Sequence, residues 1–183
     1  MDTVELLSHP VRLRIVHALS GGARLTTAQL VDRLPDVSKA TVYRHVGLLA
    51  EGGLLEVDGE QRVRGAVERR YRVRRDRTVI DGETAAALPL EDHRRGFASF
   101  VAALLAEFNV YLDRDDAAPA SDGVSYWQGT IWLSQDELAA MVDEIRDAIW
   151  SRKANEATPD RAPHLLSTIL FPTQRPPEDA PEQ

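Results

Sequence analysis

The first apolar pattern lies in residues 3–19, where apolar side chains recur at steps of three and four and predict a helix. Pro10 lies inside this segment, and proline fits best in the first turn of a helix, so a restart after Ser8 and His9 is one interpretation. Gly21 and Gly22 follow the segment and end it, because glycine adopts the left-handed cap conformation without steric cost.

Two shorter helical patterns follow, separated by a turn of four residues. Thr26 and Gln29 have the spacing of a capping box, which predicts the start of a helix that Pro35 stops. Ser38 can cap a third helix, which is expected to run to about Glu51. The inward positions of this third helix are predicted to be Val42, Val46, Leu48 and Leu49.

Two β-forming runs come next, at residues 54–57 and 68–73. We expect them to form an antiparallel hairpin, with the turn starting at Asp58 and Gly59 and an arginine-rich segment forming a long tip. Three short helices followed by such a hairpin is the element order of a winged helix-turn-helix.

The second half of the chain is predicted to contain longer helices and two further strands. A long helix is predicted over residues 91–113, followed by a polar loop to Gly123 and an alternating segment, residues 124–133, that we interpret as a strand. Ser134 and Glu137 form a second capping box, and residues 164–171 form a further predicted strand. The helix from Ser134 to about Lys153 is expected to bury Leu138, Met141, Val142, Ile145 and Ile149.

Charge divides the chain near residue 78. Residues 1–78 hold 14 Lys and Arg against 10 Asp and Glu, whereas residues 79–183 hold 8 against 19. A basic first part and an acidic second part indicate that only the first meets a polyanion. We therefore predict an α+β protein with a winged helix-turn-helix domain in residues 1–78, a helix-rich α/β domain for dimerisation and effector binding in residues 79–171, and a disordered tail in residues 172–183.

The third helix predicts double-stranded DNA as the partner, because a helix fits the major groove and places polar side chains against base edges. Arg44 is the candidate for a bidentate guanine contact, and Ser38 and Thr41 are candidates for phosphate contacts. The predicted DNA-binding residues of this helix are Ser38, Lys39, Thr41, Tyr43, Arg44 and His45.

The hairpin adds positive charge. Eight arginines lie in residues 60–77, and Arg62 and Arg64, nearest the tip, are predicted to contact the DNA backbone or minor groove. Arg72 and Arg74 fit a solvated strand equally well. An arginine-rich run alone is often only a solvated face. DNA binding is favoured because the turn, the polar helix and the basic hairpin occur together and in order.

The first part of the chain resembles ArsR-like winged-helix repressors. The resemblance rests on residues 9–19 for the opening helix, residues 37–49 for the recognition helix and residues 53–55 for the entry to the wing. It implies a homodimeric transcription regulator, usually a repressor released by a ligand. The chain departs from the metal-sensing members because it has no cysteine, and Glu91, Asp92 and His93 are followed by no second histidine at helical spacing. Neither a metal site nor a cofactor is therefore expected.

The acidic half has two open interpretations. The apolar stripe of residues 97–112 fits either plain core or a subunit interface, and alanines beside the large residues allow close approach of a partner helix. Residues 124–133 mix aromatic and hydrogen-bonding side chains, as pockets for small organic ligands do, yet a doubly packed sheet or an aromatic dimer surface fits as well. The candidate effector-binding residues are Tyr126, Gln128, Trp132 and Trp150.

Other function classes have less support. A winged helix that binds proteins and not DNA is the alternative. Catalysis is not expected, because the chain shows no nucleophile elbow, phosphate-binding glycine loop or zinc-protease signature, and the aspartates at 113, 115 and 116 lie in a polar loop. The acidic start of the chain lacks a signal-peptide pattern, and no apolar run approaches the ~20 residues of a membrane span, so a cytoplasmic protein is expected.

Overall fold

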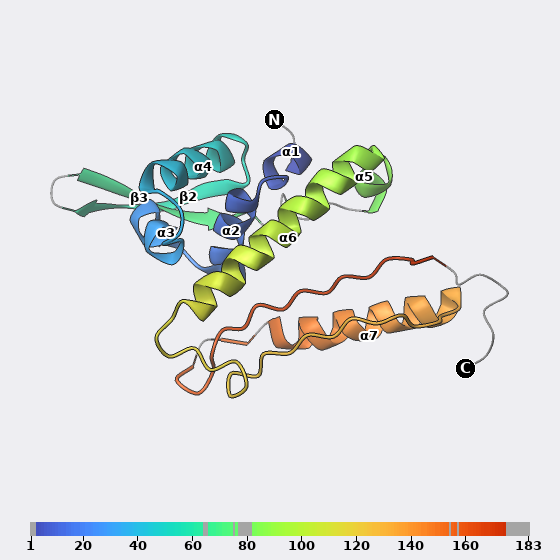
Figure 1. Cartoon of the computed structure of the whole chain (residues 1–183). Helices are drawn as coiled ribbons and strands as arrows, with labels where there is room; N and C mark the ends of the chain where they lie inside the picture. The colour runs from blue at the N-terminus through green and yellow to red at the C-terminus, as the bar shows by residue number, and fades with distance from the viewer. Residues whose placement is uncertain are drawn as a thin grey trace. The chain divides into compact units, whose positions relative to one another are not determined.

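The computed structural model describes residues 3–63, 66–74, 76, 82–153, 155–156 and 158–174. The chain divides into two compact units, residues 1–123 and 124–183 (Figure 1). Helices and a three-stranded antiparallel sheet in the first unit confirm the α+β winged helix-turn-helix fold. The domain boundary predicted at residues 78–79 falls outside the described residues, as does the tail from residue 175 onward.

Two helices replace the single one at the start of the chain, as the position of Pro10 allowed. Helix α1 covers Thr3–Leu7 and α2 covers Pro10–Ala18. His9 caps α2, because its Nδ1 accepts a hydrogen bond of 3.2 Å from the backbone N–H of Val11. The buried Arg12 donates to the carbonyl oxygens of Leu6 and Glu5 and so satisfies the free end of α1.

The helix-turn-helix consists of α3, Thr27–Arg33, and α4, Lys39–Glu51. The predicted capping box is present, with Thr26 and Gln29 each bonding the other's backbone N–H. Both helices and α2 pack around one core that excludes water and holds α4 in place. The most deeply buried members of this core are Leu6, Ile15, Leu19, Leu30, Leu34, Val42, Val46, Leu49 and Leu54.

The wing is longer than predicted and turns at a different place. Strands β2, Leu55–Val63, and β3, Ala66–Val73, pair antiparallel, and a short β1, Leu25–Thr26, pairs with the other edge of β3. The turn predicted at Asp58 and Gly59 is wrong, because β2 continues through both residues with a register shift between Val57 and Glu60. Gly59 has a φ of 127°, which fits a bulge in the strand.

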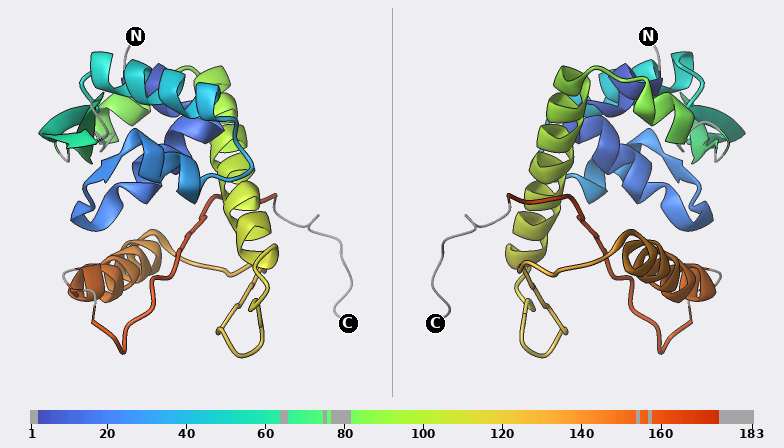
Figure 2. Two further views of the ribbon diagram at one scale, coloured as in Figure 1. Left: turned by 90° about the vertical axis from the view of Figure 1, so that its left-hand side faces the viewer. Right: turned by 90° about the vertical axis from the view of Figure 1, so that its right-hand side faces the viewer.

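A long helix follows the wing and packs beside the helix-turn-helix. Short α5 covers Gly82–Ala86, and α6 covers Leu90–Leu112, close to the predicted bounds. Helix α6 packs along α2 and contacts α1 (Figure 2). Its Ala103 is fully buried. At about 100° per residue, Phe97, Val101, Leu105 and Leu112 lie on the opposite side of α6 from Ala103, and all four are exposed. Helix α6 therefore has one packed face and one open apolar face.

The second unit departs most from the predictions. Among the residues of this unit that the structure describes, the one regular element is α7, Gln135–Lys153, and the capping box between Ser134 and Glu137 is present. The strands predicted at residues 124–133 and 164–171 are wrong: both segments are described and neither forms strand pairs. Alternation supplies a strand's side-chain pattern, but a strand also needs a partner backbone for its N–H and C=O groups.

The burial predicted for α7 is also wrong. Leu138 and Val142 are exposed, and Met141, Ile145 and Ile149 are only half-buried. Among the described residues of 124–174, not one is buried. The apolar stripe of α7 is present, but within the described part of this unit no core covers it. Over the described residues, no helix is both long and apolar enough to cross a membrane.

Candidate nucleic-acid interface

Helix α4 presents one apolar and one polar face. Val42, Val46 and Leu49 point into the core and are at most 2% exposed. Ala40, Tyr43 and Arg44 lie on the side of α4 that points away from these residues, and Lys39 is exposed as the first residue of the helix. The core therefore fixes the roll of α4 about its axis, and the roll decides which side chains a partner meets. Of these four, Lys39, Tyr43 and Arg44 lie where the sequence predicted.

The N-terminus of α4 is capped by the hydroxyl group of Ser38, which also lies next to the hydroxyl group of Thr41. Ser38 Oγ accepts a hydrogen bond of 3.3 Å from the backbone N–H of Thr41, and the two hydroxyl oxygens lie 2.8 Å apart. Ser38 is exposed and Thr41 is half-buried. Both candidate phosphate contacts thus lie at the accessible start of the helix, where backbone N–H groups favour an anion.

Lys39 and Tyr43 form one surface on this face. The Lys39 ammonium lies 5.6 Å from the centroid of the Tyr43 ring, and the ring is 46% exposed. A cation over an aromatic face is held in position electrostatically. The pair offers a positive charge together with a flat ring at the exposed start of α4.

His45 is the one residue of the predicted set that does not face outward. It is 2% exposed, and its ring centroid lies 4.4 Å from that of His9. Burial, followed by the neighbouring charges of His9, Arg44 and Arg12, lowers the pKa of His45 from 6.5 to about 4. A buried, neutral imidazole presents nothing to a base edge, so we correct this prediction: His45 is a core residue of α4.

Arg44 is exposed but partly engaged. Its Nη2 lies 3.3 Å from His45 Nε2, a hydrogen bond along the edge of the histidine pair. A guanidinium has five N–H donors, so this contact leaves donors for an external acceptor. The bidentate guanine contact predicted for Arg44 requires its fork to turn away from His45.

The base of the wing is neutralised by ion pairs. Glu56 on β2 accepts from Arg72 Nε at 2.6 Å and from Arg74 Nε at 3.0 Å, and these hydrogen bonds lower the pKa of Glu56. Arg69 Nε lies 3.2 Å from Glu60 Oε1, and Arg24 Nε lies 2.8 Å from Asp58 Oδ2. Three carboxylates thus face four arginines at the base of the wing, so most of the positive charge there is compensated within the domain.

The tip of the wing differs from its base. Arg62 is exposed, and within the part of the chain that the structure describes it has no ion-pair partner. Arg64, the other predicted wing contact, lies outside the described residues. The candidate for an external phosphate contact on the described part of the wing is therefore Arg62.

A groove of about 460 Å³ lies between α4 and the wing. Residues of α3, α4 and β3 line it, among them Tyr43, Arg69 and Tyr71. It joins the outward face of α4 to the returning strand of the wing. A partner lying along α4 therefore also meets β3.

The four candidate effector residues do not form an enclosed site. Tyr126 is 79% exposed, Trp132 is 71% exposed, and Gln128 and Trp150 are exposed as well. Trp150 has the ammonium of Lys153 4.8 Å from its ring centroid. Residues 124–133 do not form the predicted strand, so the structure gives no reason for their aromatic and polar side chains to gather on one face.

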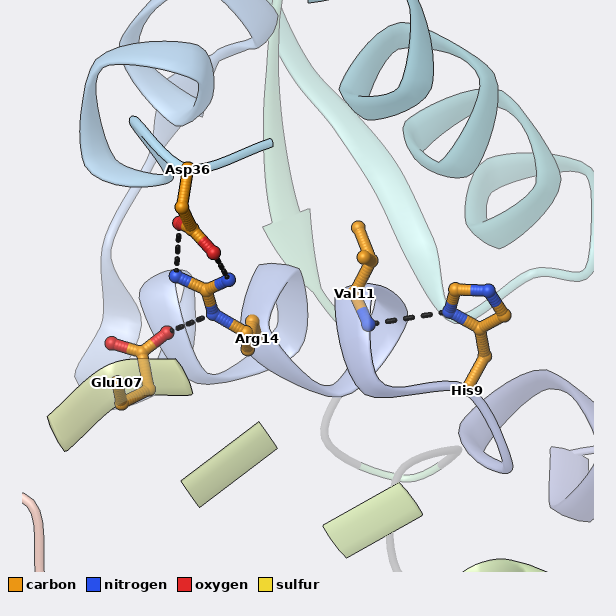
Figure 3. Close-up of polar contacts among 5 residues, drawn as sticks. All are labelled: His9, Val11, Arg14, Asp36 and Glu107. Carbon is orange, nitrogen blue, oxygen red and sulfur yellow. Dashed lines mark hydrogen bonds and ion pairs between the residues drawn. The ribbon is translucent and has the colours of Figure 1, made fainter. Parts of the chain in front are cut away.

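Two groups were missed by the sequence reasoning. Ala40 is on the exposed face of α4, and its spacing from Tyr43 and Gly47 would have shown this. Arg14 is buried and pairs with Asp36 and Glu107 (Figure 3). These partners are 22 and 93 residues away from Arg14, and no local pattern indicates such contacts. Within the described residues, no cluster of three or more potential metal-ligating side chains occurs.

Comparison with known proteins agrees with this geometry. Residues 7–58 match a family model described as a helix-turn-helix domain. Residues 7–58 form a helix-turn-helix domain. The matched segment includes α2, α3 and α4 and ends in β2, so it holds the predicted recognition helix and stops before the arginines of the wing. No match was found among curated proteins.

Proposed function

We propose that the protein is a sequence-specific DNA-binding transcriptional regulator that reads the major groove with α4. The observation that carries this is the roll of α4: its core residues turn Tyr43 and Arg44 outward, next to Lys39, which is exposed at the start of the helix. In helix-turn-helix proteins, the N-terminal residues of the recognition helix are the ones that reach base edges. The helix-turn-helix match over residues 7–58 supports the same function.

The wing has a different role in this proposal. Arg62 contacts phosphates or the minor groove, and the paired arginines at the base of the wing mainly keep the hairpin together. A phosphate contact adds affinity without adding sequence information. Base readout by α4 and backbone contact by the wing are therefore separable by mutation.

A homodimer is the form that binds in this proposal. The open face of α6 exposes Phe97 by 48% and Leu105 by 59%, which is costly for a helix in water. A second copy pairing through this face buries the stripe and supplies a second α4 for the other half-site. The resemblance to ArsR-like repressors supports this arrangement and a repressor role. A small-molecule effector in the second unit stays a prediction.

The decisive test is selection of bound duplexes from a random library, followed by binding of the recovered site at several salt concentrations. We expect Arg44→Ala to reduce the preference for the selected site over random duplex. Arg62→Ala is expected to weaken binding to both and to lower the salt slope by about one unit. Arg146→Ala, which removes an exposed arginine of α7 paired with Asp143, is the matched control and should change neither.

Two outcomes would contradict the proposal. If no sequence is enriched and binding hardly changes with salt, the domain is a protein-interaction module. If Arg44→Ala and Arg62→Ala have equal and small effects, α4 and the wing do not have the roles proposed here.

A further inference from the structure

The Arg14 side chain connects two segments that are far apart in the sequence. Its Nη1 and Nη2 donate to the two carboxylate oxygens of Asp36 at 2.6 and 2.8 Å. Its Nε donates to Glu107 Oε1 at 2.6 Å (Figure 3). Arg14 is 2% exposed, so this three-residue cluster, which we term the Arg14 triad, is anchored in the body of the domain.

Asp36 gives the triad its connection to the recognition helix. It lies in the turn between α3 and α4, two residues before the cap Ser38. Burial opposes the charged form of Arg14, but hydrogen bonds with Asp36 and Glu107 outweigh it and raise the Arg14 pKa. The same contact lowers the pKa of Asp36. A bidentate arginine–carboxylate pair fixes both distance and angle, and it therefore fixes the turn.

Glu107 gives the triad its connection to α6. It lies one turn from Ala103, on the side of α6 that packs against α2. Phe97, Val101 and Leu105 are on the opposite, open side. If α6 shifts along α2, the Glu107 carboxylate that holds the Arg14 guanidinium shifts with it. Because α6 is a continuous helix, a contact on its open face can cause such a shift.

We propose that Arg14 is a positioning residue that couples the placement of α6 to the turn that sets α4. Glu107 orients the guanidinium through Nε, and the oriented fork holds Asp36. Whatever covers the open face of α6 thereby influences the presentation of Lys39, Tyr43 and Arg44. The consequence for DNA affinity rests on the proposed function, whereas the mechanical coupling itself does not.

The test is amide hydrogen exchange on the full chain with the variant Glu107→Ala. The readouts are the amides of Val37 and Val42, which donate to Leu34 and Ser38 in and just after the turn. Loss of the Nε acceptor should make both exchange faster by on the order of tenfold, the effect of losing one charge-assisted hydrogen bond. Glu107→Gln keeps an acceptor oxygen and is expected to restore nearly wild-type exchange.

Two controls separate coupling from a general loss of stability. Glu91→Ala removes an exposed carboxylate of α6 that pairs with Arg94, and it should leave Val37 and Val42 unchanged. Exchange of the Tyr71 amide in β3, the central strand of the sheet, reports opening of the whole domain. Equal acceleration at Tyr71 and at Val42 would overturn the proposal, as would unchanged exchange in Glu107→Ala or failure of Glu107→Gln to rescue.

The converse experiment tests reciprocity, which any coupling between two sites requires. Asp36→Ala, which removes both acceptor oxygens, should speed exchange in α6 around residues 103–108, with the N-terminal end of α6 unchanged. If α6 does not respond, the coupling is refuted. Binding of the library-selected duplex by Glu107→Ala should weaken several-fold and recover in Glu107→Gln. If wild type binds no duplex, the proposed function fails while the exchange results still decide the coupling.

Discussion

His45 should make the helix-turn-helix domain sensitive to mild acid. Its ring is buried beside His9 and near Arg44 and Arg12, and its pKa in the folded chain is lowered from 6.5 to about 4. In the unfolded chain the imidazole takes up a proton near pH 6.5. Between these values the unfolded state binds more protons, so the free energy of unfolding decreases as the pH falls.

The size of the effect follows from the two pKa values. Relative to neutral pH, protonation of the unfolded state near pH 5 costs about 2 kcal/mol of stability. The full contribution of His45 is present above pH 6.5 and is lost as the pH falls toward 4. Most carboxylates stay ionised at pH 5, so their titration does not dominate this range.

The assay is urea unfolding near pH 7 and near pH 5 for wild type and His45→Phe. The variant keeps a ring next to His9 but cannot take up a proton, so its loss of stability between the two pH values should be smaller by about 2 kcal/mol. His9 and His17, whose pKa values burial also lowers, remain in both proteins and cancel to first order. His93→Phe, at an exposed position on α6, is the control. Equal pH dependence in wild type and His45→Phe would refute the reasoning.

Further predictions concern the elements that position α4 and the wing. Ser38→Ala removes the cap of α4 and should lower the free energy of unfolding by about 1 kcal/mol in urea titrations, whereas Ser38→Asp, which can also cap, should lose much less. Gly59→Ala forces a side chain onto a backbone with φ of 127°, so it should destabilise the domain by about 1 kcal/mol or more, measured by thermal unfolding. Unchanged stability in both would contradict the cap and the bulge. Leu105→Glu puts charge on the open face of α6 and should shift a dimer to monomer in analytical ultracentrifugation, while Glu91→Gln should not. A dimer that survives Leu105→Glu has its interface elsewhere.

Local signals predicted where several helices begin and end. The capping boxes at Thr26 and Ser134 were found from sequence and are formed, because their hydrogen bonds join residues three apart. Pro10 indicated the break between α1 and α2 for an equally local reason. The outward face of α4 followed from helical periodicity once its apolar residues were assigned to the core.

Features that depend on distant contacts were missed. Arg14 is one example, because its partners come from the turn and from α6. His45 is different: it lies three residues after Val42 and four before Leu49, so helical spacing places it on the buried side of α4, and the polar character of its side chain masked that signal. The strand predicted at residues 124–133 failed because alternation does not supply a pairing partner.

The most direct test of the account is photo-crosslinking from a single position on α4. With a photoreactive residue at Ala40, which is exposed between Lys39 and Tyr43, the protein should crosslink to the library-selected duplex. The same residue at Val101, on the open face of α6, should crosslink to a second copy of the chain. Crosslinking of the duplex at position 101 but not at position 40 would contradict the claim that α4 reads DNA.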